Sequence, residues 1–210
     1  MSGLVSFEAL KLAAGSVILS PNVPLLFMGQ EYGEDTPFLY FVSHSDPHLI
    51  EGVRQGRKKE FEAFVWSEEF PDPQSADTFV KSKIQWEKRG QGRNMTLLNF
   101  YRELIHLRKT VPSLSPPERD CLSVRSDAAQ KTVIIQRSKD SNHTLIILNF
   151  NKTDITIGNL AAGKEWEKML VSSDKSWDGP GSSLPSSIEG DEEVLIRAES
   201  FALYGNDRSS

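Results

Sequence analysis

Three acidic side chains near the N-terminus are the first candidates for chemistry. Glu31, Glu34 and Asp35 follow an apolar run from Val23 to Met28. Paired carboxylates can divide the roles of nucleophile and general acid, but only where their surroundings push their pKa values apart. Nothing in this stretch supplies such opposing surroundings, so we do not expect Glu31 and Glu34 to form a catalytic pair. A structural role for Glu31 and a contact between Glu31 and a substrate both stay open.

The apolar run that precedes these acids predicts a β-strand. Val23 to Met28 is too continuous for a strand with one face in water, which favours a parallel sheet covered by helices on both faces. Gly29 and the acids would then lie at the carboxyl end of this strand. In α/β barrels the loops at that end build the active site, and a substrate contact by Glu31 would arise there.

Composition and charge exclude several classes of function. The 210 residues carry a formal net charge of -5, so no basic field is available to hold nucleic acid or an acidic membrane surface. No apolar stretch approaches the roughly 20 residues of a membrane span, and the first residues lack the features of a signal peptide. Cys121 is the only cysteine, His48, His106 and His143 show no ligand spacing, and His44 before Ser45-Asp46 suggests a helix cap. We expect a cytoplasmic protein without a metal site or a cofactor.

The first half of the chain follows a helical pattern interrupted by a long insertion. Apolar residues recur at helical spacing from Phe7 to Ile18. Asp46-Pro47 predicts a helix start, with an N-cap acceptor followed by proline at the first helical position. No period holds between Trp66 and Gly92. A further helix is expected to begin at Asn94 or Thr96, with Leu97, Phe100, Tyr101 and Leu104 on its buried face.

The second half of the chain has a β pattern. The segment from Pro112 to Pro117 is the clearest boundary in the sequence. Beyond it, short β-branched and apolar runs recur with turn signals between them, which predicts an antiparallel β-sandwich. The predicted strands are 132–136, 144–150, 155–157, 166–171, 193–197 and 200–204.

A single buried parallel strand cannot form a sheet, because its amides and carbonyls need partners on both sides. A complete (β/α) barrel takes about 250 residues, and fewer than half that number precede the boundary. We therefore predict an α/β part followed by a β part. Residues 1–112 would be the C-terminal end of an incomplete (β/α)8 TIM barrel, with a helix, the eighth strand, an insertion and the last helix; residues 113–210 would be the antiparallel β-sandwich domain.

The residues of the first half also resemble a known family. Pro24 to Glu31 is similar to the eighth-strand motif of the α-amylase clan, in which a short apolar run, a glycine and an acid close the barrel. Three later blocks, in the same order, resemble malto-oligosyltrehalose trehalohydrolases. The acid-rich turn is Glu31-Tyr32-Gly33-Glu34. The three later blocks are Pro37 to Phe41, His44 to Pro47 and Gly56 to Phe61. The resemblance covers Leu4 to about Leu114 strongly and the β part more loosely.

The resemblance implies a glycoside hydrolase of the α-amylase family that acts in trehalose biosynthesis. Such an enzyme hydrolyses the α-1,4-glucosidic bond next to a terminal trehalose unit, with retention, and in the retaining mechanism two carboxyl groups lie about 5–5.5 Å apart. In this clan those acids follow earlier strands than the eighth, so no catalytic residue is assigned here and the chain alone is expected to be inactive. Gln30 and Glu31 are the candidate substrate-binding residues, for malto-oligosaccharide or malto-oligosyltrehalose.

Two other interpretations stay open at this point. The chain could belong to another enzyme of the clan, such as a branching enzyme or a maltogenic amylase, which shares the eighth-strand motif. It could instead be a non-catalytic carbohydrate-binding module formed by the β part. Self-association of the truncated chain is expected in either enzyme interpretation, because the strand from Val23 to Met28 would lack its neighbours. Phe38, Tyr40 and Phe41 could stack on glucose rings or pack over the barrel.

Overall fold

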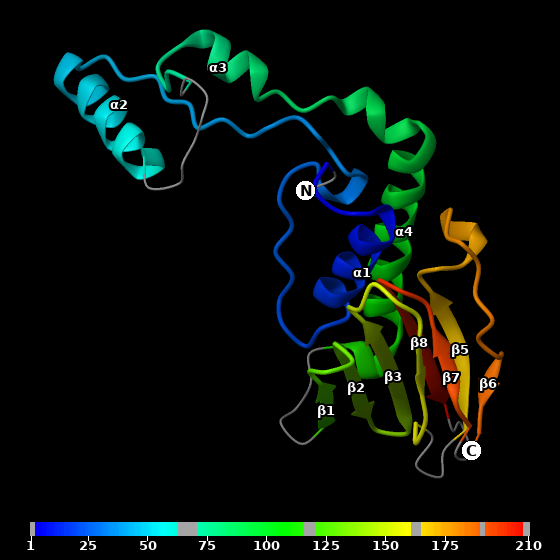
Figure 1. Cartoon of the computed structure of the whole chain (residues 1–210). Helices are drawn as coiled ribbons and strands as arrows, with labels where there is room; N and C mark the ends of the chain where they lie inside the picture. Colours follow the sequence, from blue (N-terminus) through cyan, green and yellow to red (C-terminus); the bar gives the residue numbers. More distant parts are fainter. Residues whose placement is uncertain (1–2, 63–70, 116–120, 161–164, 190–191, 208–210) are drawn as a thin grey trace. The chain divides into compact units, whose positions relative to one another are not determined.

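The computed structural model describes residues 3–62, 71–115, 121–160, 165–189 and 192–207 (Figure 1). The chain forms two compact units. The first unit combines residues 1–33 with residues 87–210, and the second unit consists of residues 34–86. Each unit is described separately. Predictions that fall on 63–70 and 116–120, including the C-terminal end of the proline-rich boundary, lie outside the described residues.

Helices of the first unit follow the predicted pattern closely. α1 (Phe7–Ile18) begins after Ser6, whose side chain accepts a hydrogen bond from the Ala9 amide. α4 (Gly92–Thr110) starts slightly before the predicted position and buries the predicted face, Leu97, Phe100, Tyr101 and Leu104. The short turns η1 (Gln30–Tyr32), η3 (Pro112–Leu114) and η5 (Lys175–Trp177) complete this unit, and η2 (Trp86–Gly90) lies at the junction with the second unit.

Eight antiparallel strands form two sheets in the described part of the first unit. The larger sheet has the order β1-β2-β3-β8-β5-β6, and the smaller sheet pairs β4 with β7. The strands are β1 (Leu122–Asp127), β2 (Thr132–Lys139), β3 (Asn142–Asn149), β4 (Ile155–Ile157), β5 (Trp166–Val171), β6 (Ser187–Ile188), β7 (Val194–Ile196) and β8 (Ser200–Asp207). The predicted β-rich C-terminal part is therefore present, with β1 and β6 in addition to the predicted strands.

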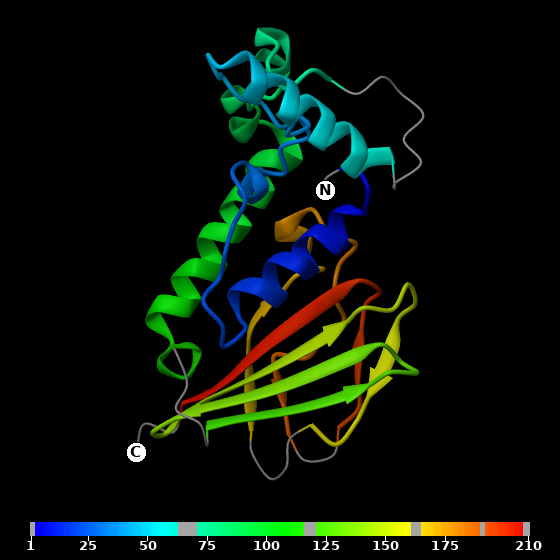
Figure 2. The same cartoon turned by 90° about the vertical axis from the view of Figure 1, so that its left-hand side faces the viewer.

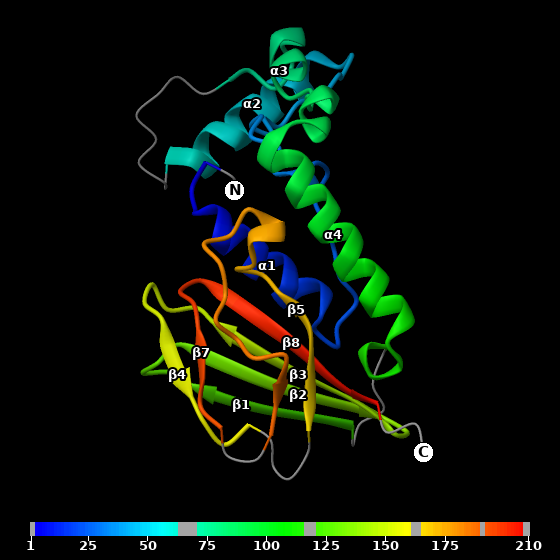
Figure 3. The same ribbon diagram turned by 90° about the vertical axis from the view of Figure 1, so that its right-hand side faces the viewer.

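The larger sheet is buried on both faces, because alternate residues of its central strands enter different cores. Ile146 and Leu148 of β3 pack with α1 and α4 in one core. Leu145 and Ile147 pack in a second core, which also contains the apolar residues of β4 and β7. Figures 2 and 3 show α1 and α4 on one side of the larger sheet and the small sheet on the other. The helical cover explains why β3 is apolar on both faces.

The predicted strand from Val23 to Met28 is wrong for this chain. The segment is extended but has no ladder partner among the described residues, and η1 follows it. Val23 is 91% exposed and Leu25 is 90% exposed, whereas Leu26 packs against the helical core. The physical cause is non-local: strand geometry requires hydrogen-bonded neighbours, and no described strand adjoins this segment. The segment has the apolar composition of a buried strand, but Val23 and Leu25 are exposed to solvent in this chain.

Two arginines fix the chain between α1 and this extended segment. Arg108 of α4 donates to the carbonyls of Ile18, Ser20 (2.6 Å) and Asn22 (2.8 Å). The fully buried Arg137 of β2 donates to the carbonyls of Leu19 (2.8 Å) and Ser115. Burial, assisted by the charge of Arg108, lowers the pKa of Arg137 to about 10, which still leaves it cationic at neutral pH. Both cations thus satisfy carbonyls at the C-terminus of α1, where the helix dipole favours positive charge.

A glycine permits the close approach of α1 to the larger sheet. A Cβ atom at Gly15 would overlap the ring of Phe201 in β8, whereas a Cβ atom at Gly52 of the second unit would meet nothing within 4 Å. Both glycines lie inside helices, where alanine is intrinsically preferred by about 1 kcal/mol. Their different surroundings allow a matched comparison of one substitution at two sites.

We expect Gly15→Ala to destabilise the first unit by about 1–3 kcal/mol, the usual cost of overpacking a core. Gly52→Ala should instead leave stability unchanged or raise it by about 0.4–1 kcal/mol, since the helical conformation accepts alanine without strain. Urea denaturation followed by circular dichroism measures both changes. Equal effects of the two substitutions would contradict the close contact between α1 and β8.

In its described residues, 34–62 and 71–86, the second unit contains the helices α2 and α3 and an extended segment. α2 (Pro47–Glu62) begins as predicted, because the Asp46 carboxylate accepts hydrogen bonds from the amides of His48 (2.8 Å) and Leu49 (3.3 Å). α3 (Ala76–Lys81) lies in the stretch where no period was found, and the Ser75 side chain caps it by accepting from the Asp77 amide. Six residues are too few for a helical period to be recognised.

Candidate functional site

Gln30 closes the turn that follows the exposed apolar segment. Its side-chain oxygen accepts from the Phe27 amide (3.1 Å), and its own amide donates to the Phe27 carbonyl (3.0 Å). The side-chain nitrogen donates to the Tyr101 hydroxyl of α4 (3.2 Å). Gly29 and Gly33, with φ of 82° and 71°, allow the tight η1 turn between them. Gln30 is therefore occupied in holding the turn to α4, and its role as a substrate ligand stays a prediction.

Glu31 occupies the next position in η1 and is half-buried. Among the described residues, its carboxylate makes no hydrogen bond or ion pair. Burial is the main cause that raises the pKa of Tyr101. The hydrogen bond with Gln30 lowers this pKa, and the negative charge of Glu31 raises it further. The structure thus places Gln30 against Tyr101, with Glu31 at the next position of the same turn. The Glu31 carboxylate retains its acceptor capacity, which a sugar hydroxyl could use.

Glu34 has a structural role in the second unit. Its carboxylate accepts hydrogen bonds from the amides of Asp35 (3.0 Å), Thr36 (2.9 Å) and Gln85 (2.7 Å). These bonds join the start of the unit to its end. A carboxylate engaged by three backbone amides is held as an acceptor, which agrees with the expectation that Glu31 and Glu34 are not a catalytic pair.

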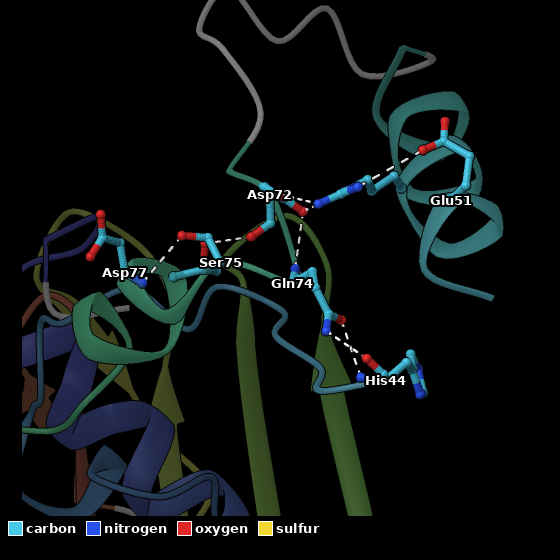
Figure 4. Close-up of polar contacts among 8 residues, drawn as sticks. His44, Glu51, Asp72, Gln74, Ser75 and Asp77 are labelled. Atoms are coloured by element: carbon cyan, nitrogen blue, oxygen red, sulfur yellow. Dashed lines mark hydrogen bonds and ion pairs between the residues drawn. The ribbon is translucent and has the colours of Figure 1, made fainter. Parts of the chain in front are cut away.

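A polar network in the second unit holds the loop before α3. Asp72 forms a bidentate pair with Arg54, with N–O distances of 2.9 and 2.6 Å, and its carboxylate also accepts from the Gln74 amide (3.0 Å). These bonds, that from Arg54 foremost, hold the pKa of Asp72 below its usual value. Figure 4 shows Asp72 between Gln74 and the helix that carries Glu51.

The same network fixes the extended segment that contains the second family-like block. The Gln74 side chain accepts from the His44 amide (3.2 Å) and donates to the His44 carbonyl (2.8 Å), as Figure 4 shows. The Pro73 carbonyl accepts from the Val42 amide (2.8 Å). The nearly buried Ser82 hydroxyl accepts from the Leu39 amide (3.1 Å) and lies 3.0 Å from the Leu39 carbonyl. Sequence reasoning missed Gln74 and Ser82, because both act through contacts distant in the chain.

The described residues contain no group of three or more His, Cys, Asp or Glu side chains that could hold a metal ion. In the same part of the chain, no helix has the length and apolar character that crossing a membrane requires.

Comparison with known proteins gives consistent relatives. No family model matches the chain. A malto-oligosyltrehalose trehalohydrolase of Mycobacterium tuberculosis is 38% identical over 131 residues, which is 62% of this chain and 23% of that protein. The trehalohydrolase of Saccharolobus solfataricus is 47% identical over 106 residues, 50% of this chain and 17% of that protein. The chain thus spans about a fifth of the length of the curated relatives it matches.

Solved structures of α-amylase-family enzymes are similar to this chain. A crystal structure of an α-amylase-type protein from Salmonella typhimurium matches with a TM-score of 0.75 and 29% identity, over 97% of this chain and 31% of that one. An isomaltulose synthase from Klebsiella shares the fold at 16% identity, with a TM-score of 0.58 over 94% of this chain and 38% of that one. Over the part that the curated relatives match, this chain is a relative of the malto-oligosyltrehalose trehalohydrolases, and its structural neighbours are α-amylase-family enzymes.

Proposed function

We propose that the chain is the C-terminal part of a glycoside hydrolase that, in intact form, releases trehalose from malto-oligosyltrehalose. The proposed reaction is retaining hydrolysis of the α-1,4-glucosidic bond next to the trehalose unit. The single observation that carries the proposal is the run of identity to trehalohydrolases, 38–47% in the two relatives described. The catalytic carboxylates are proposed to lie on other strands of the intact enzyme.

The exposed apolar segment supports the structural side of the proposal. We propose that Val23 to Met28 is the eighth strand of a (β/α)8 barrel whose other strands belong to the intact protein. Its composition is that of a doubly covered strand, yet Val23 and Leu25 are almost fully exposed in this chain. Burying such side chains is worth roughly 1.5–3 kcal/mol each. Neighbouring barrel strands would provide both that burial and the missing backbone partners.

We also propose that residues 113–210 form a separate β domain in the intact enzyme. The core between the two sheets supports this proposal, because every residue in it lies between Ile134 and Tyr204. The other core is shared with α1 and α4. In the intact protein these helices would therefore connect the β domain to the barrel.

Glu31 is the proposed substrate contact, and Gln30 the residue that positions the turn. Glu31 lies in the turn directly after the proposed eighth strand, where barrel loops face the substrate. Its carboxylate oxygens can accept from sugar hydroxyls. Gln30 holds the same turn against Tyr101, as its two side-chain hydrogen bonds indicate.

A second candidate, another α-amylase-family activity such as branching or maltogenic hydrolysis, is favoured by one observation. The α-amylase-type structure matches 97% of this chain with a TM-score of 0.75 and 29% identity, so the fold is compatible with an α-amylase-family activity other than trehalose release. The two candidates differ in their products, so product analysis separates them.

The test is a graft. The matched segment of the Mycobacterium trehalohydrolase is replaced by the corresponding residues of this chain, and products from malto-oligosyltrehalose are separated by chromatography. We expect free trehalose as the main product, with kcat/KM within roughly tenfold of the parent, a difference of about 1.4 kcal/mol. A folded graft that yields maltose or branched glucan would favour the second candidate, and a folded graft without activity would contradict both. The graft with Glu31→Gln should show a raised KM with little change in kcat, the signature of a lost binding contact.

A further inference from the structure

Both neighbours of Glu31 in the η1 turn are held by side chains of α4. On one side, the side-chain nitrogen of Gln30 donates to the Tyr101 hydroxyl (3.2 Å). On the other side, the side-chain nitrogen of Asn94 donates to the carbonyl of Tyr32 (2.6 Å). The backbone that carries Glu31 is therefore fastened to α4 through the residue before it and the residue after it.

The η1 turn depends on these contacts because its own residues restrict it little. Gly29 and Gly33 flank the turn with positive φ, and glycine has more conformational freedom to lose on folding than any other residue. The hydrogen bonds within the turn, donated by the amides of Tyr32 and Gly33, are 3.3 and 3.1 Å long, and 3₁₀ turns have poorer hydrogen-bond geometry than α-helices. Contacts from outside the turn must therefore add to the constraint, and α4 provides two of them.

The contacts between η1 and α4 are sheltered from water. Tyr32 is 1% exposed, Tyr101 is 3% exposed, and Asn94 is half-buried. Removing a hydrogen bond in such surroundings is costly, since the polar group left behind is partly shielded from solvent. Truncation of Asn94 should therefore loosen the turn.

The part of α4 that holds η1 is itself anchored to the β part of the first unit. The Thr96 hydroxyl donates to the carboxylate of Asp178, which directly follows η5 (2.6 Å). The fully buried Phe100 ring meets the Trp177 ring edge to face, with the centroids 5.1 Å apart. Asn94 thus belongs to a stretch of helix that contacts on η5 fix in place, and a group supported in this way can hold its neighbour precisely.

We propose that Asn94 and Tyr101 are positioning residues, which hold η1 so that the Glu31 carboxylate is oriented toward the substrate. This inference rests on the proposed function, in which Glu31 is the substrate contact. Neither Asn94 nor Tyr101 is proposed to touch the sugar. Their effect on substrate binding should therefore be exerted through Glu31 and should disappear when its carboxylate is absent.

The first measurement is amide exchange in the 210-residue chain, which needs no enzymatic activity. The amides of Tyr32 and Gly33 donate within the turn, so their exchange reports its opening. Asn94→Ala should accelerate both amides roughly three- to tenfold, the equivalent of one lost hydrogen bond. Asn99→Ala is the matched control, because Asn99 lies on the same helix, is exposed, and accepts from Arg102 (3.0 Å). It should leave the exchange of both amides unchanged.

A second pair of variants removes one hydroxyl group each. Tyr101→Phe deletes the acceptor for Gln30 and should accelerate the same two amides of the turn. Tyr204→Phe deletes a hydroxyl that donates to the Pro185 carbonyl (3.2 Å), from a tyrosine in the core between the two sheets, and should leave the turn unchanged. Circular dichroism melts confirm that each variant is folded.

The second measurement is a double-mutant cycle in the graft. Asn94→Ala is expected to raise KM roughly three- to tenfold with little change in kcat, and to add less than about twofold when Glu31→Gln is already present. A residue that only stabilised the fold would have the same effect in both backgrounds. The cycle therefore separates positioning of Glu31 from general support of the structure.

Unchanged exchange of the turn amides in Asn94→Ala and Tyr101→Phe would overturn the proposal. So would an active graft in which Asn94→Ala raises KM equally in both backgrounds, or in which Glu31→Gln leaves KM unaltered. Accelerated exchange in the chain together with a folded but inactive graft would support the hold of α4 on the turn and would remove only the trehalohydrolase activity.

Discussion

The purified 210-residue chain is expected to release no trehalose from malto-oligosyltrehalose, at concentrations where the graft gives complete conversion. Retaining hydrolysis needs a nucleophile and an acid about 5–5.5 Å apart. In the described residues, the candidate acids near the apolar segment do not provide this pair. The Glu34 carboxylate is engaged by the backbone amides of Asp35, Thr36 and Gln85, which gives it a structural role. Because both catalytic carboxylates are proposed to lie on other strands of the intact enzyme, we expect no measurable activity from the chain alone.

The measurement is enzymatic detection of free trehalose after prolonged incubation, against a blank without protein. The matched control is Glu31→Gln in the full chain, which removes the acid without changing the size of the side chain. Trehalose release by the parent chain that disappears in Glu31→Gln would show that the chain carries its own catalytic acid. The proposed division of function between this chain and the remainder of the enzyme would then be wrong.

Elements whose signals are local could be predicted from the sequence. Ser6 and Asp46 each start a helix because a short polar side chain accepts amide bonds from the first turn. The buried face of α4 follows from apolar spacing alone. β4 and β5 have the predicted bounds, 155–157 and 166–171, since β-branched and apolar runs there end at turn residues.

Elements with weak local signals were missed for identifiable reasons. β1 (Leu122–Asp127) alternates polar and apolar residues only weakly, because it lies at the edge of the larger sheet and most of its residues are exposed. β6 has two residues, and its pairing with β5 is set by that partner. α3 has only six residues, which are too few for a helical period to be recognised, although Ser75 caps it.

The segment from Val23 to Met28 shows that amino-acid composition alone does not predict strand pairing. The apolar run predicts a buried strand, and the chain adopts an extended segment without the pairing, because pairing depends on partners that composition cannot place. The candidate site has the same limit. Gln30 and Glu31 were identified from their position after the run, whereas the bond from Gln30 to Tyr101 of α4 spans 71 positions in the chain.

A second large effect is expected in the amide hydrogen exchange of the exposed segment from Val23 to Met28. The amides of Val23, Leu25, Leu26 and Met28 have no hydrogen-bond acceptor among the described residues, so they should exchange with solvent at nearly the intrinsic rate. The amides of Leu145 to Leu148 lie in the centre of the larger sheet and are the matched internal reference. Their exchange requires opening of the sheet, and we expect it to be at least about a hundredfold slower.

The most direct test of the account compares this exchange in two proteins, the 210-residue chain and the graft, by hydrogen–deuterium exchange with mass spectrometry. We expect fast exchange at the amides of Val23, Leu25, Leu26 and Met28 in the chain and strong protection of the same amides in the graft, where neighbouring barrel strands supply hydrogen-bond acceptors and cover. Leu145 to Leu148 should be protected in the chain. Slow exchange from Val23 to Met28 in the isolated chain, or fast exchange in an active graft, would contradict the proposal that this segment forms a barrel strand in the intact protein.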